Sequence, residues 1–239
     1  MAARVLSYGD VLLREGDLAL LDPPNWFNDQ LISFFFELLS REEGVAVCGP
    51  RPGGAPGPVL LVPPSLTFLL SMLGQWQELD AFLAPLQVAK RQLVLFALNN
   101  NTDSTAANGG SHWSLLVFHA ATHTLRHYDS SPGTNAAVAR SFARLLMPWL
   151  RHTLAGSTAE IGPALQLHEA GGPRQANAHD CGVYICAEAR FLCGAVAQQA
   201  QESLEETEKR MQEAITPDAV INMRSELRHI IHSKIGTNC

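Results

Sequence analysis

The feature of the sequence that most constrains the fold is a continuous apolar run at residues 93–98, which reads Leu-Val-Leu-Phe-Ala-Leu. A short apolar run of this kind is typical of a fully buried strand. A strand that is buried on both faces needs other strands beside it and further elements over its two faces. The rest of the chain therefore has to provide both.

Two more strands are predicted soon after this run. Residues 99–110 form a polar loop rich in Asn, Thr, Ser and Gly, and residues 113–119 and 124–129 then show strand patterns separated by a tight turn. Two strands joined in this way form an antiparallel hairpin. Residues 164–169 are a candidate for a further strand.

Helical patterns surround these strands. Residues 28–40 are apolar at most positions, which suits a helix that is buried on most sides. We therefore expect an α+β fold in which helices flank a central mixed sheet. Further helices are predicted at residues 65–74, 77–83, 135–150, 181–193, 199–214 and 217–234, the last with Thr216 as its cap.

The size of the chain fits one compact domain. Its 239 residues are 46% hydrophobic, and a chain of this length buries roughly 70–75% of its unfolded surface. No polar linker divides the chain near its middle, so we expect a single domain over residues 1–239. Residues 44–58 are rich in glycine and proline and predict a surface loop.

The charge pattern argues against two classes of partner. The formal net charge is −6 and no Lys/Arg-rich run is present, so we expect no binding to nucleic acid or to an anionic membrane. The uncharged residues 52–77 are long enough to span a membrane, but their prolines and glycines argue against a membrane-spanning helix there. The first residues lack the apolar core of a signal peptide, so a cytoplasmic or nuclear location is expected.

The cysteines indicate neither a disulfide framework nor a metal site. There are five of them, and without an export signal we expect reduced thiols. The spacing of Cys181, Cys186 and Cys193 does not match a zinc-ligand pattern, and the pair His229 and His232 has no second ligand pair nearby. We therefore expect no metal and no cofactor.

Two residues with catalytic chemistry are predicted to meet at one edge of the sheet. His112 precedes the first hairpin strand, and Asp129 ends the second. Because antiparallel neighbours place the start of one strand beside the end of the other, we expect the two side chains to lie together. Asp129 would then hold one ring nitrogen of His112 and fix its orientation.

Cys181 lies where a loop enters an apolar helix. A thiol at a helix N-terminus gains from the positive end of the helix dipole, and an adjacent imidazole completes its activation as a thiolate–imidazolium pair. Gln175 and the backbone N–H of Cys181 are placed to donate to the oxyanion of a tetrahedral intermediate. Gly182 is expected to allow a tight turn beside the nucleophile.

Each of these residues also has an ordinary interpretation. A single Cys in an apolar helix is usually a core residue, His112 alone fits a structural strand end, and Asp129 alone fits a turn. The residue types therefore leave a Cys–His–Asp enzyme as one hypothesis among several. Other histidines compete as bases, namely His119, His123, His127 and His179.

Four stretches resemble the sentrin-specific protease family, and they occur in that family's order over nearly the whole chain. They are residues 6–29, which end in Asn-Trp-Phe-Asn-Asp, residues 110–117, which begin Gly-Ser-His-Trp, His-Tyr-Asp-Ser at 127–130, and Gln-x-Asn-x-x-Asp-Cys-Gly at 175–182. The resemblance implies an adenain-like, papain-like cysteine protease fold. It also implies a triad of His112, Asp129 and Cys181, with Gln175 at the oxyanion hole.

The resemblance further implies a substrate. Residues 20–29 and the absence of a long N-terminal extension are similar to the deneddylating members, whose substrate is the Gly-Gly tail of the neddylation modifier and of its conjugates. In the family, the tryptophans matching Trp26 and Trp113 cover the diglycine. Two indoles that close over a backbone leave no space for a Cβ, so only Gly-Gly passes through. The enzyme is expected to act as a monomer.

Two positions depart from the family or have two interpretations. Phe27 replaces an aliphatic residue, which is expected to alter packing only, and the segment 44–58 is longer than in the deneddylating members. Asp29 is a candidate partner for a basic residue in the modifier's tail, and equally a helix N-cap acid. Three alternatives stay open: a desumoylating protease, an acyltransferase on a related fold, and a non-catalytic binder of ubiquitin-like proteins.

Overall fold

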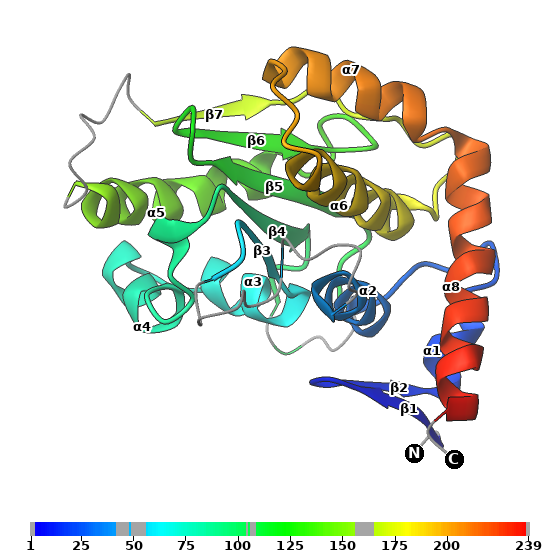
Figure 1. Cartoon of the computed structure of the whole chain (residues 1–239). Helices are drawn as coiled ribbons and strands as arrows, with labels where there is room; N and C mark the ends of the chain where they lie inside the picture. Colours follow the sequence, from blue (N-terminus) through cyan, green and yellow to red (C-terminus); the bar gives the residue numbers. More distant parts are fainter. Residues whose placement is uncertain are drawn as a thin grey trace.

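The computed structural model describes residues 3–41, 48, 56–103, 105, 109–155 and 165–237. At its centre is a sheet in the order β3-β4-β5-β6-β7 (Figure 1). β4 pairs antiparallel with β5, and β5 with β6, whereas the two outer pairs are parallel, so the predicted mixed sheet is confirmed. The strands are β3 (Val59–Val62), β4 (Leu93–Asn99), β5 (Trp113–His119), β6 (Thr124–Tyr128) and β7 (Gln166–Glu169).

Helices cover both faces of this sheet, as the α+β prediction requires (Figure 1). Helices α2 and α6 pack on one face, α3 and α5 pack on the other, and α8 packs against α6. The described helices, with two 3-10 turns, are α1 (Glu15–Ala19), α2 (Asp29–Arg41), α3 (Pro64–Ser71), η2 (Trp76–Leu79), α4 (Asp80–Leu83), η3 (Val88–Lys90), α5 (Ala136–Leu154), α6 (Cys181–Ala197), α7 (Leu204–Ala214) and α8 (Pro217–Thr237).

Strand β4 explains why the apolar run has no polar alternation. Leu95 and Ala97 belong to the core shared with α2 and α6, while Val94 and Phe96 belong to the core under α5. All four side chains are buried. Successive side chains of a strand point to opposite faces, so a strand with a core on each side must be apolar throughout. The prediction of a fully buried strand is confirmed.

The structure contains strands before residue 93 that the sequence pattern does not predict. β3 is a four-residue apolar run between Pro58 and Pro63, too short to show a period, and its parallel pairing with β4 supplies what local sequence does not indicate. A two-stranded hairpin also precedes the sheet, formed by β1 (Arg4–Tyr8) and β2 (Val11–Arg14). Gly9, with φ +56°, provides its turn.

Most predicted helices are present with shifted ends. α7 begins at Leu204 rather than at residue 199, because the Ser203 side chain accepts from the backbone N–H of Glu206 and caps it there. The predicted cap of α8 is confirmed, since Thr216 Oγ1 accepts from the N–H of Ala219 at 3.2 Å. Of the Gly/Pro-rich segment 44–58, residues 44–47 and 49–55 lie outside the described residues. None of the helices in the described ranges is long and apolar enough to cross a membrane.

Candidate active site

His112 and Asp129 meet at one edge of the sheet, as the hairpin pattern predicts. His112 immediately precedes β5, Asp129 immediately follows β6, and the two strands pair antiparallel. His112 Nε2 lies 2.6 Å from Asp129 Oδ1, and both side chains are buried. The two residues therefore form a hydrogen-bonded pair shielded from solvent.

Backbone donors hold Asp129 in the orientation that this pair needs. The N–H of Ser131 donates to Oδ1 and the N–H of Asn135 donates to Oδ2, each at 3.0 Å. Burial alone would raise the pKa of this carboxyl, but the hydrogen bonds from His112, Asn135 and Ser131 outweigh it and hold the pKa of Asp129 below its usual value. The side chain is therefore an ionised acceptor for the imidazole at neutral pH.

Asn135 is a site residue that the sequence pattern marks only as a helix start. Its Nδ2 donates to Ser114 Oγ at 2.9 Å and to the carbonyl of His112 at 3.3 Å. Together with its backbone bond to Asp129, Asn135 contacts both members of the pair from the N-terminus of α5. Its two short-range signals, an Asn and a following apolar pattern, are those of any helix cap and do not reveal this role.

Cys181 is the first residue of α6, where it is buried near the His112 ring and helps to raise the pKa of that ring. Because Nε2 of His112 binds Asp129, Nδ1 is the ring nitrogen left for the sulfur. Burial lowers the pKa of His112, but the hydrogen bonds with Asp129 and Cys181 outweigh burial and raise this pKa to about 9. The imidazole is therefore protonated at neutral pH, which is the state required beside a thiolate.

The competing histidines are excluded as the base by where they lie. His127 is fully buried between Glu169 Oε2 at 2.7 Å and Ser114 Oγ at 2.9 Å. His119 lies at the opposite end of β5, where burial and the Arg126 charge lower its pKa to about 4. His123 lies in the turn after β5, and His179 has a partly exposed side chain 3.9 Å from Asp180.

Gln175 lies beside the pair, with its side chain hydrogen-bonded at both ends. Oε1 accepts from Ser130 Oγ at 2.7 Å, and Nε2 donates to the carbonyl of Asn177 at 2.6 Å. The backbone N–H of Gln175 also donates to the carbonyl of Ser130 at 2.9 Å. Ser130, which the sequence pattern marks only as the end of a strand, thus fixes which way the amide points.

A cavity of about 420 Å³ opens next to His112, between the two tryptophans of the predicted channel. The Trp26 indole is exposed, with 45% of its surface accessible, while Trp113 is partly buried and donates from Nε1 to the carbonyl of Phe27 at 3.0 Å. The cavity is lined by Gly16, Asp17, Leu20, Trp26, Phe27, Asn28, Asn99, Gly109, Gly110, Ser111, His112 and Trp113.

Gly182 is needed for packing rather than for a tight turn, which corrects the prediction. It lies in the first turn of α6. A Cβ placed on Gly182 would approach the Cβ of Phe27 at 2.7 Å and Cδ1 of Trp113 at 3.4 Å. The missing side chain allows α6 to pack directly against the wall of the cavity.

Asp29 is the first residue of α2, and the capping role that competes for it belongs to its neighbour. Asn28 Oδ1 accepts from the N–H of Leu31 at 3.0 Å, and Asn28 Nδ2 donates to Asp17 at 2.7 Å. In the described part of the chain, no hydrogen bond or ion pair is seen for the half-buried Asp29 carboxylate. Its charge still lies near the N-terminal end of a helix, which is favourable.

Arg224 of α8 lies beside the site, and the sequence pattern does not reveal it. Its buried guanidinium forms an ion pair with Asp180, the residue before Cys181, with Nε donating to Oδ1 at 2.8 Å. It also lies over the Phe27 ring, 4.7 Å from the centroid. The remaining donors bind backbone carbonyls of Leu20, Leu21, Asn25 and His179.

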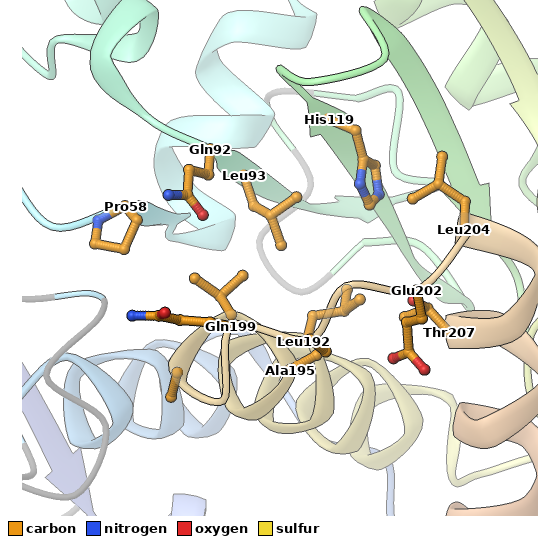
Figure 2. Close-up of a pocket in the computed structure, with 13 residues that line it drawn as sticks. Pro58, Gln92, Leu93, His119, Leu192, Ala195, Gln199, Glu202, Leu204 and Thr207 are labelled. Atoms are coloured by element: carbon orange, nitrogen blue, oxygen red, sulfur yellow. The ribbon is translucent and has the colours of Figure 1, made fainter.

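A larger cavity, of about 530 Å³, lies at the far end of β5 from His112 (Figure 2). Figure 2 shows His119 pointing from β5 into this space, with Leu204 and Leu192 from the helical side. His119 Nε2 is buried there without a partner among the described residues. Within those same residues, no cluster of three or more His, Cys, Asp or Glu side chains is placed to hold a metal ion.

The sequence and the fold are similar to those of known proteins. Sentrin-specific protease 8 of Homo sapiens is 32% identical over 227 residues, which are 95% of each chain. NEDD8-specific protease 1 of Arabidopsis thaliana is 29% identical over 95% of this chain and 92% of its own. The solved C-terminal protease domain of Ulp1, in complex with Smt3, the yeast ortholog of SUMO, has a TM-score of 0.66 at 18% identity and covers 98% of this chain and 89% of that one.

The structural likeness confirms the predicted cysteine protease fold. The sequence model described as the Ulp1 protease family, C-terminal catalytic domain, matches residues 91–224. That range contains His112, Asp129, Gln175 and Cys181. With the relatives above, it confirms the resemblance to sentrin-specific proteases, and the chain belongs to the Ulp1 protease family.

Proposed function

We propose that this protein is a deneddylase, a cysteine protease that cleaves after the C-terminal Gly-Gly of the neddylation modifier and removes it from conjugated lysines. The observation that carries the proposal is the buried His112–Asp129 pair, with 2.6 Å between Nε2 and Oδ1, next to Cys181 at the start of α6. The names of the relatives, sentrin-specific protease 8 and NEDD8-specific protease 1, support the choice of modifier. The protein acts as a single domain and as a monomer, in the cytoplasm or the nucleus.

The reaction proceeds by thiol hydrolysis in two steps. The Cys181 thiolate attacks the carbonyl of the terminal glycine, and the His112 imidazolium protonates the leaving amine. Water, activated by the now neutral imidazole, then cleaves the acyl-enzyme. Asp129 keeps the imidazole oriented and stabilises its charge.

The oxyanion is stabilised by Gln175 and the backbone N–H of Cys181. Gln175 Nε2 carries two hydrogens, and one of them is used by the carbonyl of Asn177. The other remains for the developing negative charge, and Ser130 holds the amide in this orientation by donating to its oxygen. Losing one such donor typically costs about 10²–10³-fold in rate.

The tail reaches the thiol through the cavity between Trp26 and Trp113. Trp113 is fixed by its bond to the Phe27 carbonyl, whereas the exposed Trp26 is free to cover an incoming chain. Side chains other than hydrogen do not fit between two closing indoles, so the last two residues must be glycines. Asp29, whose capping role is taken by Asn28, serves as the partner of a basic residue upstream of the diglycine.

Labelling with electrophilic probes tests both the chemistry and the choice of modifier. The full chain is incubated with the modifiers of neddylation and of sumoylation, each carrying a thiol-reactive group in place of the last glycine. We expect fast labelling of the parent protein by the neddylation probe and no labelling of Cys181→Ala. This variant should still bind the neddylation modifier that carries no reactive group. Preferential labelling by the SUMO probe would establish a desumoylating protease instead. Full turnover by Cys181→Ala would refute the nucleophile.

A further inference from the structure

Two cysteine sulfur atoms lie close together outside the site around His112. Cys48 Sγ and Cys193 Sγ are 3.3 Å apart. A disulfide has a sulfur–sulfur distance of about 2.05 Å, so the two atoms need to approach by only about 1.3 Å. The two residues lie 145 positions apart in the sequence, so folding alone creates this proximity.

We propose that Cys48 and Cys193 are an oxidation site at which a peroxide joins the two thiols in an intramolecular disulfide. This inference concerns a different pair of residues from the proposed protease chemistry and does not depend on it. In reducing conditions the two groups remain thiols that share a hydrogen bond. Oxidation replaces that contact with a covalent link between Cys48 and α6.

The surroundings of the two sulfurs assign them different parts. Cys48 is partly exposed, so peroxide reaches it first. Susceptibility of a thiol to oxidation follows its exposure. Cys193 is buried, and its hydrogen bond with Cys48 together with burial raises its pKa. Cys193 therefore stays a thiol until the Cys48 sulfur has been oxidised.

The chemistry balances with one peroxide. The Cys48 sulfur attacks a peroxide oxygen, the O–O bond breaks, and water and a Cys48 sulfenic acid are formed. The Cys193 sulfur then attacks the Cys48 sulfur and loses its proton, the S–O bond breaks, and a second water leaves. The two sulfurs together supply the two electrons that reduce the peroxide.

The other described cysteines are not placed for this reaction. Cys186 lies on the same helix but is fully buried, and burial raises its pKa. Cys181 lies at the start of that helix and belongs to the proposed active site. The pair formed by Cys48 and Cys193 is thus the one in which an accessible thiol has a resolving thiol within reach.

The test uses the full chain with Cys181→Ser, which removes the thiol at the His112 site. The protein is treated with hydrogen peroxide, remaining thiols are alkylated, and a digest without reductant is analysed by mass spectrometry. We expect a linked peptide that contains Cys48 and Cys193, lighter by two hydrogen atoms than its parts and separated again by dithiothreitol. The melting temperature should rise after oxidation, because the bond constrains the unfolded chain.

Three matched variants sharpen the result. Cys186→Ser, on the same helix, should leave the linked peptide intact, whereas Cys48→Ser should abolish it without opening a core cavity, because Cys48 is only half-buried. Cys193→Ala should also abolish it and leave Cys48 to over-oxidise to the sulfinic acid. The proposal would be overturned if the protein that has both cysteines yielded Cys48 as the sulfinic acid and Cys193 as a free thiol, alkylated only after unfolding.

Discussion

At the scale of single residues, the charge state of the His112 ring sets the expected pH dependence. Its pKa is raised to about 9 by Asp129 and Cys181. Because the reactive pair needs a protonated imidazole, kcat/KM for a fluorogenic modifier substrate should fall as the pH rises through about 9. In Asp129→Asn the supporting charge is lost, so this fall should move to lower pH, and the rate should drop by up to about 10⁴-fold. An unmoved alkaline limb would contradict the assignment.

Gly182 gives a second prediction at this scale, with a control on the same helix. Gly182→Ala places a Cβ 2.7 Å from the Cβ of Phe27, so α6 or the cavity wall must shift. We expect a loss of about 1–3 kcal/mol in the free energy of unfolding, measured in urea. Gly194→Ala has no atom within 4 Å of the new Cβ and should be neutral or slightly stabilising. Equal effects of the two changes would show that the contact with Phe27 does not account for the loss in the free energy of unfolding.

At the scale of elements, α8 binds two segments that lie far apart in the sequence. One contains Asp180, and the other contains Leu20 and Asn25. Arg224 is buried with Asp180, so Arg224→Met leaves a buried carboxylate without its cation and should cost about 3–5 kcal/mol of unfolding free energy. Arg228, one turn later, pairs with the exposed Asp22, and Arg228→Met should cost only about 0–1 kcal/mol. Both are measured by urea unfolding, and similar losses would refute the distinction.

The sequence reveals some elements of the site and hides others for a physical reason. His112 and Asp129 were predictable because antiparallel pairing of adjacent strands places their ends together. Arg224 was not, since its partner Asp180 is 44 positions away and the carbonyl of Leu20 is 204 positions away. β3 was not predictable because a four-residue strand takes its stability from pairing with β4 rather than from its own pattern. Contacts between distant segments carry no local signal.

At the scale of the whole molecule, one buried acid couples stability to pH. Glu188 of α6 is fully buried, and neither of its carboxyl oxygens has a partner among the described residues. Burial, and then the charge of Asp129, raises its pKa well above the usual value, which favours the neutral form in the folded protein. The unfolded chain releases this proton above its ordinary pKa of about 4.5, so stability is lost as the pH rises beyond that point.

Glu188→Gln should remove this pH dependence. The variant should unfold at higher denaturant concentration than the parent protein at pH 7–8. The difference should shrink as the pH falls below about 4.5, where the glutamate is neutral in the folded and in the unfolded chain. Urea titrations at four or five pH values measure this directly. A difference that is constant with pH would mean that the glutamate is ionised in the folded state.

The contact between Arg224 and Asp180 has a consequence for the newly made protein. Ribosomes synthesise chains from the N-terminus, so Cys181 leaves the exit tunnel before α8 does. Until α8 has emerged and docked, Asp180 lacks its cation, and the carbonyls of Leu20 and Asn25 lack the guanidinium that binds them. These contacts next to Cys181 are therefore completed only after α8 has been translated.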